Sequence, residues 1–339
     1  MSGDLEILVV GGGSFGTALA NILAGLGRRT QLWVRREDLA EEINTRHTNS
    51  RYLEGFELSG NLEATTDLEG ATRQAPVILL VVPSKGFREV AQMLGDHLRG
   101  EQILVHATKG IEIGTFKRMS EILREETCVL KIGVLSGPNL ARELMVGQPA
   151  GALIASRYDQ VVAEVQDLFR GGMLRTYGGR DVIGTEVGGS FKNIIALAAG
   201  VADGMGMGDN PKALLVTRGL GEMARFGAAM GANVFTFGGL AGIGDLMATC
   251  GSPLSRNHQV GERLGKGEKL DDILGSMTHV AEGVPTTKAV HAFLESKRVD
   301  LPIVSAVHGM LYGGISARET VKKLMAIPVG DELAALRFG

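Results

Sequence analysis

The feature that most constrains the fold of this chain is a glycine-rich segment between an apolar run and a helical pattern. Residues 5–10 form an apolar run of strand length, and Gly-Gly-Gly-Ser-Phe-Gly follows directly at residues 11–16. In this context the spacing G-x-G-x-x-G is typical of a dinucleotide site. Gly11 permits the tight turn, Gly13 lets the backbone approach a pyrophosphate, and Gly16 allows close packing of the helix. The alternative is a glycine-rich turn without a ligand.

The first half of the chain alternates strand-length apolar runs with helical patterns. These runs are continuous in Val, Ile and Leu rather than alternating with polar residues, which is typical of strands covered on both faces. We therefore predict an α/β fold with a Rossmann-type, doubly wound parallel sheet. The predicted strands cover residues 5–10, 30–34, 77–82, 103–106, 132–135 and 150–155.

The second half has a different pattern. From about Gly184 onward β-branched strand runs almost disappear, and long helical patterns cover residues 185–205, 211–230 and 284–297. The pattern predicts a dinucleotide-binding, Rossmann-like domain over residues 1–185 and an all-helical domain over residues 186–339; the family resemblance given below implies that the helical domain binds the substrate.

Composition and charge exclude several functional classes. The chain of 339 residues is 44% hydrophobic, with a net charge of -3 and 5% aromatic residues, which argues against nucleic-acid binding. Two isolated cysteines and seven histidines without metal-ligand spacing predict no metal site. No apolar run is long enough for a membrane span, and the acidic N-terminal residues differ from a secretory signal. We expect a cytoplasmic protein without membrane insertion.

Two arginines follow the second predicted strand, where a dinucleotide enzyme meets the adenosine ribose. An NAD enzyme places Asp or Glu there, whereas Arg35 and Arg36 favour a 2'-phosphate. We therefore expect NADP(H) to be preferred, with NAD(H) possible. Glu37 would face the ribose if the strand ended two residues later, and a solvated charge cluster is a further alternative.

Polar residues also follow two later strands, at the carboxyl edge where an open α/β sheet binds ligands. Lys109 comes after the strand at 103–106 and can face an anionic substrate or the nicotinamide. Gly137 and Asn139 come after the strand at 132–135, and Gly137 allows close backbone contact. The alternative for Lys109 is an exposed lysine in a loop. The alternative for the segment with Gly137 and Asn139 is that it only caps a helix.

Lys192 is the strongest candidate for proton transfer. Its helical neighbours are small and apolar, Gly188 and Ala196 among them, on a helix that is apolar nearly all round. A buried lysine is costly unless it is paired, and desolvation makes it a tunable acid or base. The alternative is a lysine whose ammonium reaches solvent at the helix end.

Two further polar groups lie in the second half. Asp245 stands in a glycine-rich apolar stretch, where it can orient Lys192 or cap the helical segment behind it. Ser255, Arg256 and Asn257 combine a hydroxyl, a guanidinium and an amide, a set suited to phosphate. Ser255 can also be a simple helix cap.

Seven sequence blocks, in this order and spread over nearly the whole chain, resemble those of the bacterial NAD(P)-dependent sn-glycerol-3-phosphate dehydrogenases. Together the blocks are specific, although each alone is not. They are residues 11–20, Ala107-Thr108-Lys109-Gly110, Ser136-Gly137-Pro138, Phe191-Lys192-Asn193, residues 242–246, Ser255-Arg256-Asn257 and Ala281-Glu282-Gly283.

The resemblance implies an oxidoreductase that reversibly reduces dihydroxyacetone phosphate to sn-glycerol 3-phosphate for phospholipid synthesis, as a homodimer. Lys192 would be the proton donor and acceptor. The implied substrate-binding residues are Lys109, Gly137, Asn139, Lys192, Asn193, Asp245, Thr249, Ser255, Arg256 and Asn257. The implied dinucleotide contacts are Gly11, Gly13, Ser14, Phe15, Gly16, Arg35, Arg36, Lys109, Ala141, Arg256 and Glu282.

Two positions depart from the family pattern: Phe15 stands where Trp or Tyr is frequent, and Asn139 where bacterial members often have Ser or Thr. Two alternative functions stay open at this point. One is another Rossmann-plus-helical dehydrogenase acting on a 3-hydroxy acid, and the other is a non-catalytic NADP sensor.

Overall fold

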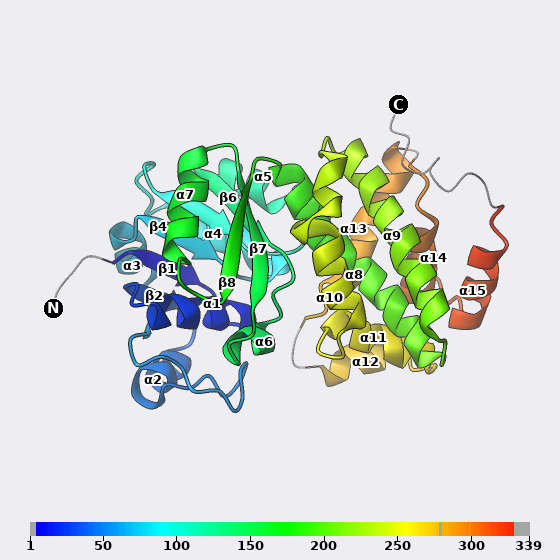
Figure 1. The fold of residues 1–339 in the computed structure, drawn as a ribbon, viewed down its shortest axis with the longest axis horizontal. Helices are drawn as coiled ribbons and strands as arrows, with labels where there is room; N and C mark the ends of the chain where they lie inside the picture. Colours follow the sequence, from blue (N-terminus) through cyan, green and yellow to red (C-terminus); the bar gives the residue numbers. More distant parts are fainter. Residues whose placement is uncertain (1–4, 278–279, 298, 329–339) are drawn as a thin grey trace. The chain divides into compact units, whose positions relative to one another are not determined.

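The computed structural model describes residues 5–277, 280–297 and 299–328, and it divides into two compact units. The sheet unit contains the described residues up to Thr108 together with Met119–Val182, and the helical unit contains Lys109–Arg118 and the described residues from Ile183 onward. Figure 1 shows the strands in the blue-to-green part of the chain and the helical unit from green to red. Whether the predicted ranges 1–185 and 186–339 fold as separate domains stays a prediction.

The sheet unit is built on eight strands in the order β3-β2-β1-β4-β5-β6-β7-β8. The Rossmann-type α/β fold is therefore confirmed. The strand bounds are β1 Ile7–Val10, β2 Thr30–Trp33, β3 Glu63–Thr65, β4 Val77–Leu80, β5 Ile103–His106, β6 Ile132–Ser136, β7 Ala150–Ser156 and β8 Leu174–Gly179.

One pairing departs from the predicted parallel sheet: β7 runs antiparallel to β6, while every other pairing among the eight strands is parallel. The reason lies in the connection between the two strands, which contains only the five-residue helix α6, Ala141–Met145. Such a helix rises about 7.5 Å, roughly half the length of the five-residue strand β6, so by itself it is too short to be the crossover helix that usually joins two parallel strands.

The sheet is covered on both faces, because successive strand residues enter different cores. Ile7 and Val9 of β1 join the core formed with α1, α2, α6 and α7, whereas Leu8 and Val10 join the core formed with α3, α4 and α5. This explains the continuous apolar runs in the sequence. The helices are α1 Ser14–Gly25, α2 Glu37–Arg46, α3 Leu68–Gln74, α4 Phe87–Gly95, α5 Met119–Glu126 and α7 Asp159–Leu168.

The helical unit is organised around the long helix α8, Val182–Gly204, whose residues from Gly184 to Leu197 are all buried. The other helices are α9 Asp209–Ala229, α10 Asp245–Gly251, α11 Arg256–Gly265, α12 Leu270–Ser276, α13 Gly283–Lys297, α14 Pro302–Tyr312 and α15 Ala317–Met325. The short helical segments η2 Val234–Gly238 and η3 Leu240–Gly244 precede α10. No strand occurs among the residues described from 183 to 328.

Glycines let α11 approach α8 to backbone contact. A methyl group added at Gly200 of α8 would lie 2.0 Å from the carbonyl oxygen of His258, and one added at Gly261 of α11 would lie 2.0 Å from that of Leu197. A side chain at either position would force the helices apart. This contact sets the separation between the residues that the two helices carry.

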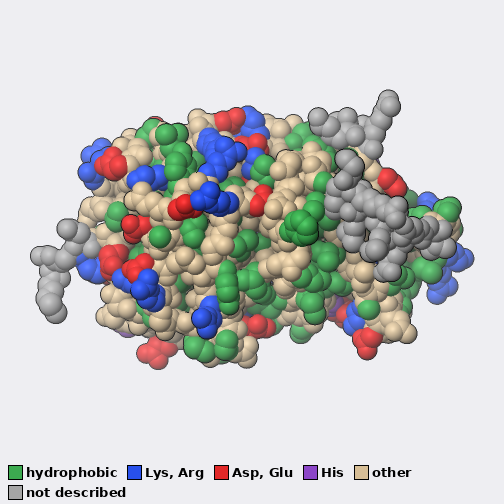
Figure 2. Space-filling model, turned by 45° about the horizontal axis from the view of Figure 1, so that its top comes forward, with side chains coloured by type: hydrophobic (Ala, Val, Ile, Leu, Met, Phe, Trp, Pro, Cys, Tyr) green, Lys and Arg blue, Asp and Glu red, His purple; other side chains and the backbone are tan. Residues whose placement is uncertain are grey.

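No described helix is both long and apolar enough to cross a membrane. On the face shown in Figure 2, basic and acidic side chains lie interspersed rather than in a field of one sign, consistent with the net charge of -3.

Candidate active site

The glycine-rich loop joins β1 to α1 in the sheet unit with the predicted geometry. Gly11 has a φ of +123°, a conformation that favours glycine. A methyl group added at Gly16 would lie 2.0 Å from the carbonyl oxygen of Gly11, so the helix start and the turn are in close contact. At Gly13, by contrast, an added methyl group meets no atom within 4 Å. The loop therefore leaves an open face at the N-terminus of α1, where a pyrophosphate fits.

A side chain that is not among the sequence-predicted site residues supports this loop. Asn49 is fully buried, and its amide donates hydrogen bonds to the carbonyl of Gly12 at 3.0 Å and to the hydroxyl of Thr17 at 2.9 Å. No local signal marks Asn49, because it lies 32 residues beyond Thr17. Ser14 uses its hydroxyl on the Tyr52 carbonyl at 2.8 Å, which leaves its backbone N–H as the group for a ligand.

The two arginines after β2 are both exposed and both carry an acidic neighbour. Arg35 lies 3.4 Å from Glu89 of α4, and Arg36 forms a close ion pair with Asp38. Exposed ion pairs of this kind contribute little stability, so a phosphate competes with them readily. Arg36 also precedes α2 as its N-cap residue, where its partner is only two residues away. The structure thus leaves Arg35 better suited than Arg36 to a 2'-phosphate.

Three of the remaining sequence-predicted residues of the sheet unit lie after β6, and Phe15 lies on α1. Gly137 has a φ of +146°, and a methyl group there would lie 2.7 Å from the carbonyl oxygen of Gly151. Asn139 is 7% exposed, and Ala141 is the first residue of α6. Phe15, on α1, is half-buried against the same core as Ala141. The close backbone contact that Gly137 allows is therefore made with Gly151 of the protein itself.

The helical unit contains a cluster of two lysines on one carboxylate, which we call the lysine–aspartate centre: Lys109, Lys192, Asp245 and Thr249. The two oxygens of Asp245 bind different lysines: Oδ1 accepts from Lys192 Nζ, and Oδ2 accepts from Lys109 Nζ at 2.7 Å. Lys192 Nζ also donates to Thr249 Oγ1 at 2.6 Å. The side chains of Lys192 and Asp245 are 6% and 2% exposed, and that of Lys109 is 18% exposed.

Glycines again explain how the chain folds locally. Gly188 lies one turn before Lys192 on α8, and a methyl group there would lie 2.1 Å from the carbonyl oxygen of Ala241. The η3 segment therefore packs directly on α8, and α10 begins at its end with Asp245. The N-cap of α10 is Gly244, so the idea that Asp245 only caps this helix is wrong. The idea that Lys192 extends to solvent is also wrong.

Burial and charge tune Lys192. The pKa of Lys192 is lowered to about 7: burial lowers it most, the Lys109 ammonium also lowers it, and the Asp245 carboxylate opposes both effects. Lys192 can therefore give or take a proton near neutral pH, as a general acid or base requires.

A polar network lies beside this centre. Asn257 of α11 donates to Asn193 Oδ1 at 2.9 Å and accepts from the Gly283 N–H at 2.8 Å. Ser255 caps α11, its hydroxyl accepting from the His258 N–H at 3.3 Å, so the capping alternative for Ser255 is confirmed. These bonds tie α8, α11 and the start of α13 together.

Arg256 is the first residue of α11, and its side chain is exposed. Within the described part of the chain its guanidinium has no hydrogen bond or ion pair, and the carboxylate of Glu282 acts on it only through its charge. A guanidinium at a helix N-terminus is suited to an anion such as a phosphate. No group of three or more metal-ligating side chains occurs among the described residues.

A dinucleotide loop on a doubly wound sheet, combined with a buried lysine that titrates near neutrality, is what a nicotinamide-dependent dehydrogenase needs. The fold places the chain in that class of protein.

Comparison with known proteins narrows this class. Models of the NAD-dependent glycerol-3-phosphate dehydrogenase N-terminus and C-terminus match residues 6–162 and 181–322. The chain is 47% identical over 334 residues to the glycerol-3-phosphate dehydrogenase (NAD(P)+) of Bacillus thuringiensis (strain Al Hakam), covering 98% of both chains. This chain belongs to the NAD-dependent glycerol-3-phosphate dehydrogenase family.

Solved structures of similar fold agree with this family assignment. The glycerol-3-phosphate dehydrogenase of Coxiella burnetii has a TM-score of 0.91 at 33% identity, covering 95% of this chain and 99% of that one. A ketopantoate reductase of Ralstonia eutropha JMP134 has a TM-score of 0.60 at 15% identity, covering 95% of this chain and all of that one, a likeness of fold alone.

Proposed function

We propose that this protein catalyses the reversible, NAD(P)H-dependent reduction of dihydroxyacetone phosphate to sn-glycerol 3-phosphate. The observation that carries the proposal is the lysine–aspartate centre, because it holds a proton donor with a pKa of about 7 in a buried position. Membership of the family supports the substrate and the use of NAD or NADP.

The sheet unit has the features that a dinucleotide requires. The open face at Gly13 and the N–H groups at the start of α1 would bind the pyrophosphate, and Arg35 would bind a 2'-phosphate. Phe15, Ala141 and Glu282 stay predicted contacts. When bound, NAD(P)H supplies the hydride.

In the helical unit, Lys192 would protonate the oxygen that becomes negative as the ketone is reduced. Asp245 holds the ammonium in place, and the Thr249 hydroxyl accepts a further N–H from it, so the group is oriented before the reaction begins. Lys109, on the other oxygen of Asp245, adds a second positive charge beside the developing alkoxide. In the reverse direction neutral Lys192 takes the proton of the alcohol.

The substrate phosphate would bind at the N-terminus of α11. Arg256 offers a guanidinium without a protein partner among the described residues, and Asn257 retains one N–H of its amide beyond the bond to Asn193. Holding the phosphate there fixes the ketone relative to Lys192, because α8 and α11 are in backbone contact. Asn193 and Ser255 would support this end of the site through the hydrogen bonds they already make, with Gly137 and Asn139 as further predicted contacts.

The deciding experiment follows oxidation of NADPH at the nicotinamide absorbance with dihydroxyacetone phosphate and, as the matched control, unphosphorylated dihydroxyacetone. We expect rapid turnover only with the phosphorylated ketone, and a repeat with NADH gives the cofactor preference. Turnover of a phosphate-free 3-hydroxy acid instead would favour a different dehydrogenase. Tight NADPH binding without turnover of any phosphorylated ketone would favour a sensor.

We also propose that the enzyme acts in the cytoplasm as a homodimer and supplies glycerophospholipid synthesis. The resemblance to the bacterial enzymes supports the homodimer and the role in lipid synthesis. Sedimentation equilibrium tests the assembly: a dimer has twice the chain mass of 35.8 kDa, and a species of one chain mass at micromolar concentration would contradict it.

A further inference from the structure

The segment that carries Lys109 has an unusual place in the fold. Residues Lys109–Arg118 belong to the helical unit, although Thr108 before them and Met119 after them belong to the sheet unit. The chain therefore enters the helical unit for ten residues and leaves it again. The proposed reaction uses only the first of these residues, which raises the question of what the other nine do.

The 109–118 segment closes on itself as a compact loop. Ile111 and Arg118 pair as an isolated antiparallel bridge, and the Glu112 N–H donates to the Lys117 carbonyl at 2.9 Å. Phe116 has a φ of +58°, a backbone conformation that residues other than glycine rarely adopt. Such a conformation persists only where the surroundings hold it in place.

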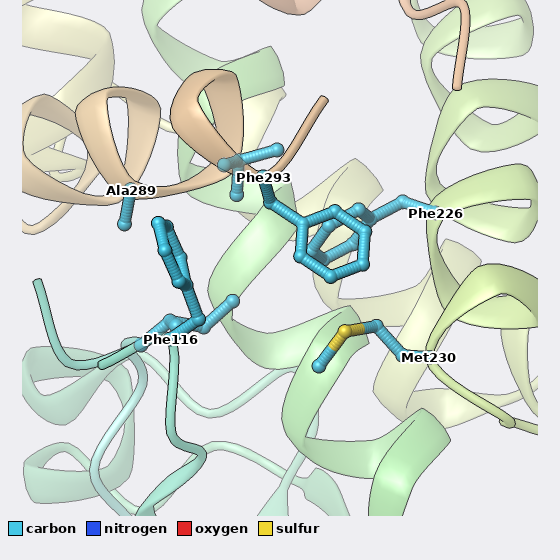
Figure 3. A pocket seen from close by; sticks show the side chains of 7 residues that line it. Phe116, Phe226, Met230, Ala289 and Phe293 are labelled. Carbon is cyan, nitrogen blue, oxygen red and sulfur yellow. The ribbon is translucent and has the colours of Figure 1, made fainter. Parts of the chain in front are cut away.

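An apolar recess holds the middle of the segment. Phe116 and Ile111 enter it from the segment, and the other lining residues come from α9, the residue that follows it, and α13: Phe226, Met230, Ala289, Val290 and Phe293. Figure 3 shows the Phe116 ring beside Ala289, with Phe293, Phe226 and Met230 around the same space. The rings of Phe116 and Phe293 meet edge to face, with centroids 6.4 Å apart.

A buried ion pair holds the end of the segment. Arg118 Nη1 lies 2.5 Å from Glu186 Oε2, and the two side chains are 10% and 3% exposed. Glu186 is on α8, the helix that carries Lys192. A buried ion pair is generally no more stabilising than a packed apolar pair, but the removal of one partner is costly because it leaves a buried charge.

We propose that Arg118 and Glu186 are positioning residues that fix the 109–118 segment on α8 and so hold Lys109 against Asp245. The inference rests on the proposed function, in which Lys109 and Lys192 act on the same oxygen. Lys109 is the first residue of the segment and binds Asp245. The backbone bridge between Ile111 and Arg118 joins the start of the segment to its end, and the ion pair with Glu186 attaches that end to α8, the helix that carries Lys192.

This role has a measurable consequence beyond the rate. The Lys109 ammonium opposes protonation of Lys192, so releasing Lys109 from Asp245 raises the pKa of Lys192. Ketone reduction needs protonated Lys192, so the loss of rate on the alkaline side moves to higher pH. A residue with a purely structural role would lower the amount of folded enzyme and leave this midpoint unchanged.

The experiment measures kcat against pH for reduction of dihydroxyacetone phosphate by Arg118→Gln and Glu186→Gln. Lys109→Met serves as the reference, and Ile113→Ala, an exposed position on the same segment, as the matched control. We expect kcat to fall about tenfold, less than the ~10²-fold typical of losing a direct charge-stabilising donor, with an alkaline shift as in Lys109→Met. Arg118→Lys should recover part of the rate, and Ile113→Ala should match the wild type.

A single substitution leaves one buried charge without its partner and can prevent folding. The double variant Arg118→Met with Glu186→Leu leaves no charge behind, and circular dichroism together with NADPH binding checks its fold. Folded variants with wild-type kcat, or with lower kcat and an unshifted pH midpoint, would overturn the inference. A wild-type protein without turnover would overturn the proposed function, and the inference with it.

Discussion

The two candidate binding regions of this protein are built in opposite ways. The dinucleotide loop is one continuous stretch whose ligand groups are backbone N–H groups, and glycines shape it. The lysine–aspartate centre draws side chains from three segments: the 109–118 segment, α8 and α10. A local backbone site depends on the conformation of a few residues, whereas the centre depends on how distant elements pack. Substitutions in the two regions should therefore fail in different ways.

The largest effect is expected at the centre. Lys192→Ala removes the proton donor, and we expect kcat to fall by about 10²- to 10⁴-fold while the Kd for NADPH stays nearly unchanged. Lys266→Ala, an exposed lysine on the same unit, is the matched control. Loss of dinucleotide binding together with activity would mean that Lys192 supports the fold rather than the chemistry.

The next effect separates substrate binding from chemistry within the helical unit. Arg256→Met removes a charged hydrogen bond to the phosphate, worth about 1.5–3 kcal/mol, so kcat/KM for dihydroxyacetone phosphate should fall roughly 10- to 100-fold. The slow reaction with unphosphorylated dihydroxyacetone, measured in parallel, should not change. An equal loss with both ketones would show that Arg256 does not read the phosphate.

In the sheet unit the corresponding change acts through the backbone. Gly16→Ala places a methyl group 2.0 Å from the Gly11 carbonyl oxygen, and such overpacking costs about 1–3 kcal/mol. We expect weaker NADPH binding and a lower free energy of unfolding. Gly25→Ala, on the same helix with no atom within 4 Å of the added methyl group, should be neutral or slightly stabilising. Equal behaviour of the two variants would contradict the close contact.

The pH dependence of the rate should report on the lysine–aspartate centre and not on the dinucleotide loop. Because burial lowers the pKa of Lys192 to about 7, the lysine loses its proton above that pH. Ketone reduction should fall by about tenfold per pH unit above 7, and alcohol oxidation should fall in the same way below 7. Initial rates in both directions at saturating substrates test this, and a reduction rate that is flat from pH 6 to 9 would exclude Lys192 as the donor.

The smallest effect is expected at the arginines after β2. Arg35→Ser should lower the preference for NADPH over NADH by about fivefold or less, since exposed charge pairs contribute little. Arg36→Ser should change it less, because the ion pair of Arg36 with Asp38 is closer than that of Arg35 with Glu89. The ratio of kcat/KM for the two cofactors measures both, and a larger effect at Arg36 would reverse the assignment.

The sequence predicted those parts of the fold that a local pattern encodes. Strands buried on both faces, such as Val77–Leu80, have continuous apolar runs and were found. The strands at the two edges of the sheet, Glu63–Thr65 and Leu174–Gly179, were missed because an edge strand is partly exposed and lacks such a run. The reversal of β7 was missed as well, since strand direction depends on the connection and not on the strand.

The candidate site divides along the same line. Local spacing alone identified the glycine loop and the buried position of Lys192. The pairing of Lys109 with Asp245 joins residues 136 apart, and the resemblance to a family, not spacing, first suggested that both face the substrate. Asn49, Arg118 and Glu186 carried no sequence signal for these roles, because the loop that Asn49 supports and the partner that Arg118 and Glu186 each find in the other lie far along the chain.

By itself, then, the amino-acid sequence determined the Rossmann-type loop, the helical second half and the lysine that has to be paired if it is buried. These follow from backbone conformation and from periodic burial, which act over a few residues. Only the tertiary structure decided which carboxylate pairs with Lys192, that this carboxylate also holds Lys109, and that residues 109–118 join the helical unit. The reason is physical: a lysine lowered to a pKa of about 7 is a property of the charges and the burial around it, and these come from segments that meet only in the folded chain.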